Sequence, residues 1–202
     1  MSGAGVHADQ ITAVILAGGM GRRMQGTDKG LVDLSGRPMV SYVVDVLQGN
    51  ASTVLINANR NIDDYEALGL RVVPDSREGY QGPLAGVEAG LAAAVTPWVY
   101  TCPCDSPLQS PALLPRLWQT VQKTGARIVM ARDDSRTHPV FSLLDTALLP
   151  SLQAYLSSGE RKIDRWFKKH SLAEADCSDL ADSFINVNTE QERAMVEARL
   201  TG

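Results

Sequence analysis

The stretch that most constrains the fold begins as a short apolar run and ends in a glycine-rich, cationic loop. Residues 11–16 (ITAVIL) are apolar and partly β-branched, which predicts a buried strand too short to span a membrane. The loop that follows holds the glycines Gly18, Gly19, Gly21 and Gly26 and the cations Arg22, Arg23 and Lys29. Because glycines let the backbone approach a ligand closely and cations attract anions, we expect this loop to bind a polyphosphate.

Two widespread phosphate-binding motifs do not fit this loop. The dinucleotide fingerprint G-x-G-x-x-G would need a third glycine where the chain has Met24. The Walker loop would need G-K-[ST], where the chain has Asp28, Lys29 and Gly30. The loop therefore belongs to another class of phosphate-binding sequence.

The string LAGG, RM and DKGL, followed by L-x-G-x-P, resembles the signature of nucleotidyltransferases that activate small molecules with a nucleoside triphosphate. It is most similar to the family of molybdenum cofactor guanylyltransferases. Further landmarks match in the order of that family: Asn57 in N-A-N-R, Asp75, G-P-L-A-G, C-P-C-D, T-H-P around His138, G-E-R and N-V-N-T. The chain departs from the family string at Gln25, where a glycine normally follows R-M, and at Met20, where a polar residue is frequent.

The resemblance implies transfer of GMP from GTP to the phosphate of molybdenum-carrying molybdopterin, with Mg²⁺ as cofactor and pyrophosphate as the second product. It also implies transient contacts with proteins that deliver the cofactor and mature molybdoenzymes. The alternatives are a related cytidylyl or sugar-phosphate nucleotidyltransferase and a GTP-binding adaptor without turnover. D-K-G-L together with N-V-N-T favours the guanylyl enzyme, and retention of Lys29 with Asp105 argues against the silent adaptor.

Length and charge narrow the class of protein further. A chain of 202 residues suits a single nucleotidyltransferase domain over residues 11–202, after a flexible N-terminus at residues 1–10. A net charge of -4 gives no general attraction to nucleic acid. No apolar window suits a membrane span or secretory signal, so we expect a cytoplasmic protein. A monomer is a separate expectation. The cysteines Cys102, Cys104 and Cys177 are odd in number and lack zinc-site spacing, so we expect reduced thiols.

Apolar patterning predicts strands that alternate with helices. Strands are expected at residues 11–16, 53–58, 71–73, 98–102, 128–131 and 183–186, and helices at 39–47, 61–68, from 82–83, from 110–111 to about 125, and from a capping box at 189–192 to about 200. Residues 145–170 are expected to be helical with an interruption at Pro150, and residues 139–143 to pair antiparallel at an edge. This order predicts a three-layer αβα sandwich with a Rossmann-like, mostly parallel sheet and an antiparallel edge.

Ligands of such folds bind beyond the carboxyl ends of the strands. Asn57, Asp75 and Asp105 each follow a predicted strand, so we expect them to face one cleft. We assign catalysis to Arg23, Lys29 and Asp105, with Asp105 as the Mg²⁺ ligand. The predicted nucleotide-binding residues are Leu16, Ala17, Gly18, Lys29, Asn57, Asp75 and Asp105. The predicted acceptor-binding residues are Arg161, Asn186 and Asn188, of which the first rests on the resemblance alone.

Three assignments stay open at this point. Asp75 suits the N–H donors of guanine but would equally suit ribose hydroxyls. Either Asn186 or Asn188 could approach the metal or the acceptor, or could serve only in a turn. His138 has no evident catalytic partner, so a structural hydrogen bond is favoured. A phosphate monoester, with a second pKa of roughly 6, would need no general base.

Overall fold

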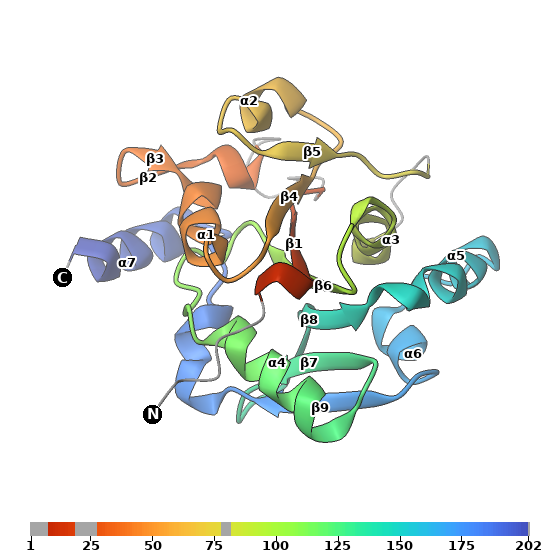
Figure 1. Cartoon of the computed structure of the whole chain (residues 1–202). Helices are drawn as coiled ribbons and strands as arrows, with labels where there is room; N and C mark the ends of the chain where they lie inside the picture. Colours follow the sequence, from red (N-terminus) through yellow and green to blue (C-terminus); the bar gives the residue numbers. More distant parts are fainter. Residues whose placement is uncertain (1–7, 19–27, 78–81, 202) are drawn as a thin grey trace.

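A seven-stranded sheet runs through the centre of the computed structural model, which describes residues 8–18, 28–77 and 82–201. Its order is β5-β4-β1-β6-β8-β7-β9 (Figure 1). The strands are β1 (Ile11–Leu16), β4 (Thr53–Asn57), β5 (Arg71–Val73), β6 (Trp98–Pro103), β7 (Ile128–Arg132), β8 (Thr137–Asp145) and β9 (Leu172–Asp176). A small hairpin of β2 (Asp33–Leu34) and β3 (Arg37–Pro38) stands apart from this sheet.

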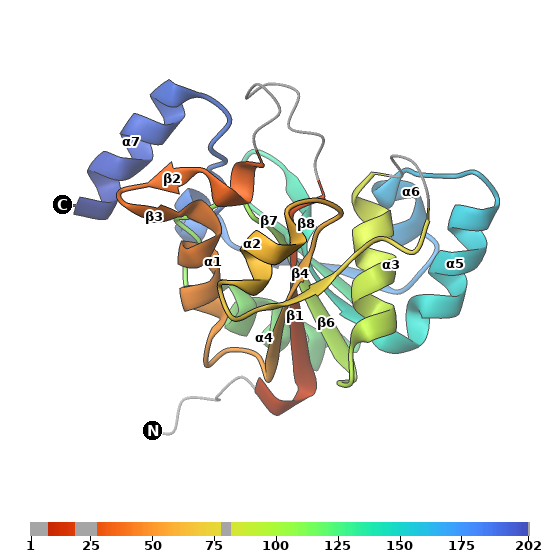
Figure 2. The ribbon, with the colours of Figure 1, turned by 90° about the horizontal axis from the view of Figure 1, so that it is seen from above.

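Helices cover both faces of the sheet, as Figure 2 shows. One face carries α1 (Met39–Leu47), α2 (Ile62–Glu66) and α4 (Leu113–Thr124), and the other carries α3 (Pro83–Ala93), α5 (Leu149–Ser157) and α6 (Ile163–Phe167). Each layer buries its own apolar cluster against the sheet. The last helix, α7 (Glu190–Thr201), lies over the hairpin and forms a third, smaller cluster with it.

The predicted fold class is confirmed. Strands β5, β4, β1 and β6 are parallel neighbours, which brings their carboxyl ends to one end of the sheet. The antiparallel strand is β8, which pairs with both β6 and β7, and β9 then pairs parallel with β7 as the outermost strand on that side. The predicted antiparallel pairing of residues 139–143 is thus part of a longer strand.

Two predictions in the second half of the chain are wrong, one at residues 183–186 and one at Pro150. Residues 183–186 form no strand: the 3-10 segment Ser178–Phe184 ends there and residues 185–186 have no regular structure. The outer strand is β9, which the sequence analysis missed. Only one residue of β9 is buried, so the apolar pattern of this strand is weak. The apolar signal at residues 183–186 comes from Phe184, whose ring packs on Phe141 outside any strand. Pro150 does not interrupt a helix, since it lies in the first turn of α5, where its missing N–H costs nothing. The interruption is at residues 158–162.

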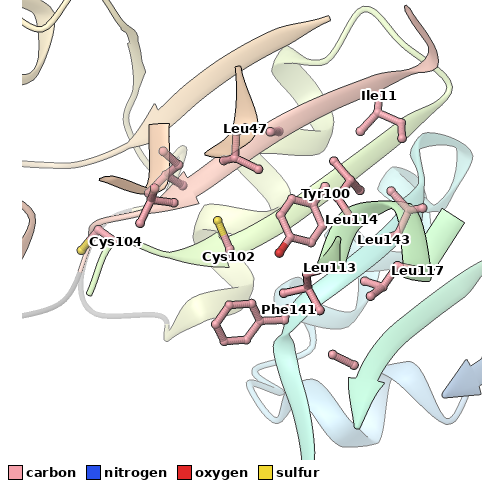
Figure 3. Packing of buried hydrophobic residues seen from close by; sticks show 14 of the residues in the cluster. Ile11, Leu47, Tyr100, Cys102, Cys104, Leu113, Leu114, Leu117, Phe141 and Leu143 are labelled. Carbon is pink, nitrogen blue, oxygen red and sulfur yellow. The ribbon is translucent and has the colours of Figure 1, made fainter. Parts of the chain in front are cut away.

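Strand β6 supplies the centre of the larger core. Figure 3 shows its residues Tyr100 and Cys102 against Leu113 and Leu114 of α4 and Leu143 of β8. The three cysteines are free and buried, as expected for reduced thiols. Burial raises the pKa of the Cys177 thiol to about 11 and that of the other two as well, so they stay protonated at neutral pH. Within the described ranges, no helix has both the length and the apolar character needed to cross a membrane.

Candidate active site

The carboxyl ends of β1, β4 and β6 are joined by backbone hydrogen bonds. The N–H of Ala17 donates to the carbonyl of Asn57 at 2.8 Å, and the N–H of Cys104 donates to the carbonyl of Leu16 at 3.2 Å. The backbone just after β1 is therefore fixed between its two neighbours. Three predicted nucleotide-binding segments, at residues 16–18, 57 and 105, start from this one point.

Lys29 joins Asp105 and Asn188 into one polar cluster. Its ammonium donates to Asp105 Oδ2 at 3.0 Å and also to Asn188 Oδ1. The side chains of Lys29 and Asp105 are 25% and 11% exposed, so this ion pair lies at a partly buried site rather than on open surface. A backbone bond of 2.9 Å from the N–H of Val187 to the carbonyl of Asp105 holds the two segments together. The structure thus brings together two of the three predicted catalytic residues.

The capping box of α7 fixes Asn188. The Glu192 carboxylate accepts from the backbone N–H of Asn188 at 2.7 Å, while the Glu192 N–H donates to Thr189 Oγ1 at 3.2 Å. The Asn188 N–H lowers the pKa of Glu192, with smaller contributions from Thr189 and the charge of Lys29. Asn186 is exposed and accepts instead from Ser106 Oγ at 2.8 Å. The sequence left these two asparagines equivalent, and the structure places only Asn188 on Lys29.

A second polar group surrounds Asp75. Its Oδ1 accepts from Asn57 Nδ2 at 2.9 Å and its Oδ2 accepts from Asn59 Nδ2 at 2.8 Å. The Asp75 N–H donates back to Asn59 Oδ1 at 2.8 Å. Both carboxylate oxygens are therefore fixed by amide donors, and each keeps capacity for a further donor. Asn59 was missed by the sequence analysis, although N-A-N-R contains it next to the chosen Asn57.

This group opens onto a pocket at the carboxyl ends of the strands. The pocket is lined by Leu16, Gly18, Asn57, Asn59, Asp75, Gly82, Pro83, Gly86, Pro103 and Val140. Four predicted nucleotide-binding residues are among them, whereas the buried Ala17 and the pair Lys29 and Asp105 do not line it. Gly86 of α3 is required here, since a Cβ would lie 2.2 Å from Asn57 Oδ1. Part of the G-P-L-A-G motif is thus explained by the space that Asn57 needs.

A neighbouring pocket shares Pro103 and Val140 with the first. Its other lining residues are Arg136, Thr137, His138, Pro139, Phe141, Phe184 and Asn186. His138 Nε2 and Asp133 Oδ2 are 2.9 Å apart, and the imidazole stacks on Phe184 with ring centroids 3.8 Å apart. The favoured structural hydrogen bond of His138 is present. Asn186 is the one predicted acceptor residue that lines this second pocket.

The other predicted residues are placed as follows. Arg161 donates from Nη1 to the carbonyls of Leu156 and Glu160 at 2.7 and 2.6 Å, so its guanidinium caps the end of α5 and lines neither pocket. Arg23 lies outside the described residues. Among the residues that are described, no group of three or more His, Cys, Asp or Glu side chains forms a metal site. A Mg²⁺ ion would suit the site nonetheless, because it takes one or two carboxylates and completes its shell with phosphate and water oxygens.

A parallel sheet with a cation, a carboxylate and several amides at its carboxyl ends defines an α/β enzyme that handles a phosphorylated ligand. Residues 13–175 match the model of the MobA-like NTP transferase domain. A molybdenum cofactor guanylyltransferase of Shewanella sediminis is 44% identical over 190 residues, which cover 94% of this chain and 97% of that protein. The chain belongs to the MobA-like NTP transferase family and is a nucleotidyltransferase.

Solved structures agree on the fold. The molybdopterin-guanine dinucleotide biosynthesis protein A of Archaeoglobus fulgidus superposes with a TM-score of 0.77 at 21% identity, covering 94% of this chain and 98% of that one. The 4-diphosphocytidyl-2C-methyl-D-erythritol synthase of Anaerococcus prevotii has a TM-score of 0.75 at 16% identity, with all of both chains covered. Enzymes with these different names therefore share the sheet and its flanking helices.

Proposed function

We propose that this chain transfers GMP from GTP to the phosphate of molybdopterin that carries molybdenum, forming molybdopterin guanine dinucleotide and pyrophosphate. A phosphate oxygen of the acceptor bonds to the α-phosphorus of GTP, and the bond from that phosphorus to the oxygen bridging to the β-phosphate breaks. The names of the Shewanella relatives support this substrate pair. The observation that carries the proposal is the contact of Lys29 with Asp105 and Asn188 at the carboxyl ends of the parallel strands.

The proposed chemistry needs positioning and charge neutralisation more than proton transfer. A phosphate monoester with a second pKa of roughly 6 is largely a dianion at neutral pH, so it can attack without a general base. The structure fits this requirement because His138 is occupied by Asp133 and Phe184. Lys29, with Arg23 from the same loop, would neutralise the triphosphate and the charge that develops on pyrophosphate.

Asp105 is the proposed ligand of Mg²⁺, with the Asn188 amide oxygen close by as a second hard oxygen donor. The ion would supply charge neutralisation between the two polyanions when bound. In this arrangement Lys29 bridges Asp105 and Asn188 before ligands arrive, and its ammonium is then available for phosphate oxygens. Two kinds of contact therefore hold Asp105 and Asn188 near each other: the backbone hydrogen bond from Val187 to Asp105, and Lys29, which bridges the two side chains.

The two adjoining pockets would divide the substrates between them. The pocket with Asn57 and Asp75 is proposed for guanosine, with the segment Leu16–Gly18 at the phosphates. The pocket with His138 and Asn186 is proposed for the acceptor. Arg161 stays an acceptor residue in the proposal only if its guanidinium leaves the carbonyls at the end of α5. Residues 11–202 would act as one domain, in a cytoplasmic monomer that exchanges the cofactor with delivery and molybdoenzyme-maturation proteins.

The test supplies molybdopterin-bound molybdenum, Mg²⁺ and GTP labelled either at the α- or at the γ-phosphate. We expect the α-label in the dinucleotide product and the γ-label in pyrophosphate. Transfer from CTP but not GTP would identify a cytidylyl enzyme instead. Binding of GTP, seen as a thermal shift without any label transfer, would identify the silent adaptor. Light scattering tests the monomer in the same preparation.

A further inference from the structure

Asp28, the residue before Lys29, is held by a buried network that no substrate contact explains. Its side chain is part of a residue only 6% exposed, and its Oδ1 accepts from the hydroxyl of Tyr65 at 2.5 Å. The same oxygen accepts from the Gly30 N–H at 3.3 Å, and Oδ2 accepts from Asn61 Nδ2 at 3.3 Å. This carboxylate is therefore fixed by three donors, one from Gly30 directly after Lys29, one from Tyr65 on α2 and one from Asn61 just before α2.

The space around Tyr65 explains the glycine in D-K-G. Tyr65 is fully buried on α2, and a Cβ on Gly30 would lie 2.5 Å from its hydroxyl oxygen. Any larger residue at position 30 would push the phenol away from Asp28. Burial is the main reason why the pKa of Tyr65 is raised, so the hydroxyl remains a neutral donor at working pH. Asp28 and Gly30 thus face inward to Tyr65, while Lys29 between them reaches Asp105.

We propose that Tyr65 is a positioning residue for Lys29, acting through Asp28 and the short 3-10 segment Lys29–Leu31. This inference rests on the proposed function, in which Lys29 neutralises phosphate charge. A lysine side chain has many rotamers, so its ammonium is precise only if its backbone is fixed. The described contacts fix that backbone from α2, whereas Asp105 and Asn188 hold the ammonium at the other end of the side chain. Losing the hydroxyl should therefore misplace the ammonium without emptying the core.

The decisive variant is Tyr65→Phe, with Tyr100→Phe as the matched control. Each removes one buried phenol hydroxyl, but the Tyr100 hydroxyl has no hydrogen-bond partner among the described residues. We expect Tyr65→Phe to lower kcat roughly tenfold to a hundredfold, as misplaced catalytic groups do, with a much smaller change in the KM for GTP. Tyr100→Phe should keep the wild-type kcat. Both are assayed well below their melting temperatures, so that unfolding does not enter the rate.

A double-mutant cycle separates positioning from a general structural role. In a Lys29→Met background, Tyr65→Phe should change the residual rate by no more than about twofold, because the group that Tyr65 positions is gone. An equal loss of rate in both backgrounds would overturn the proposal. So would a wild-type kcat for Tyr65→Phe.

A third measurement does not depend on the reaction. Hydrogen exchange of the Gly30 amide should be roughly tenfold faster in Tyr65→Phe than in Tyr100→Phe, since Asp28 then holds this amide less firmly. Unchanged exchange would refute the proposal that Tyr65 holds this segment through Asp28, even if the enzyme is active. If instead the exchange differs but wild type transfers no GMP, the proposed function fails, while the role of the Tyr65–Asp28 hydrogen bond in fixing this segment is supported.

Discussion

Replacing Gly86 with alanine should disrupt the hydrogen bonds around Asp75, because Gly86 packs directly against Asn57. Gly86 lies on α3, and a Cβ there would sit 2.2 Å from Asn57 Oδ1 and 2.8 Å from Leu16 Cδ2. A separation of 2.2 Å is impossible, so the Asn57 amide has to swing away. It would then lose its bonds to the Val73 carbonyl at 3.1 Å and to Asp75 Oδ1 at 2.9 Å.

The magnitude follows from opposing contributions. Alanine is favoured over glycine inside a helix by about 1 kcal/mol. The bond from Asn57 to the neutral carbonyl contributes about 1 kcal/mol, and its bond to the Asp75 carboxylate about 2 kcal/mol. Asn57 is only 2% exposed, so water does not replace these bonds. The net loss is roughly 2 kcal/mol before any cost of displacing the Leu16 side chain, which corresponds to a melting temperature lower by roughly 4 to 8 °C.

Differential scanning fluorimetry with and without GTP and Mg²⁺ measures both effects at once. Gly90→Ala is the matched control on the same helix, because the three atoms nearest its Cβ would all belong to Val14, the closest at 2.7 Å, and Val14 does not line the pocket. Both variants should melt early, but only Gly86→Ala should also lose the GTP-dependent rise. In an Asn57→Ala background the cost of Gly86→Ala should largely disappear. Costs that simply add would refute the role of the Asn57 contact.

The remaining predictions concern charge. Asp105→Asn keeps the shape of the side chain but removes the negative charge that we propose binds Mg²⁺. Turnover should fall by several orders of magnitude while the melting temperature stays close to wild type. Turnover within about threefold of wild type at saturating Mg²⁺ would rule out Asp105 as the metal ligand. Asp75→Ala should erode a preference for GTP over ATP, CTP and UTP that we expect to be about tenfold to over a hundredfold, and equal losses with all four nucleotides would point to ribose binding instead. Burial, with the nearby charges of Arg127 and Lys169, holds the pKa of His170 below its ordinary value of 6.5. The unfolded chain therefore binds the proton more readily than the folded chain. The free energy of unfolding then decreases as the pH falls from above 6.5 through the folded pKa. Chemical denaturation at pH 7 and pH 5 should therefore show a smaller loss for His170→Gln than for wild type, and identical losses would contradict the shift.

Local patterns in the sequence were sufficient for the parallel half of the sheet. The predicted bounds of β1, β5 and α1 are those of the structure, because each is a largely apolar segment with a glycine or proline within two residues of one end. The position of Asp105 after β6 followed from the same patterns. The fold rule that ligands bind at the carboxyl ends of parallel strands then placed Asn57, Asp75 and Asp105 at one end of the sheet, although Asp105 does not line the pocket that Asn57 and Asp75 share.

Side-chain partners could not be predicted in the same way. Nothing local in N-V-N-T shows that Asn188 contacts Lys29 while Asn186 contacts Ser106. Asn59 escaped notice because its role depends on the loop after β5, which returns Asp75 to it. Arg161 was assigned by resemblance alone, and its carbonyl partners at the end of α5 are visible only in three dimensions.

The position of Asn188 depends on the smallest of the three apolar clusters. The capping box predicted α7 from sequence, but not where the helix would pack. In the structure, Val187 and Val196 pack against Val32 and Leu34, which lie in or next to the hairpin β2–β3. The sequence analysis named no strand here, yet the hairpin begins a few residues after Lys29 and so connects α7 to the segment that carries this lysine. Because the N–H of Val187 donates to the carbonyl of Asp105, the same cluster links the segments that carry Lys29, Asp105 and Asn188, and it acts together with the capping box that fixes Asn188.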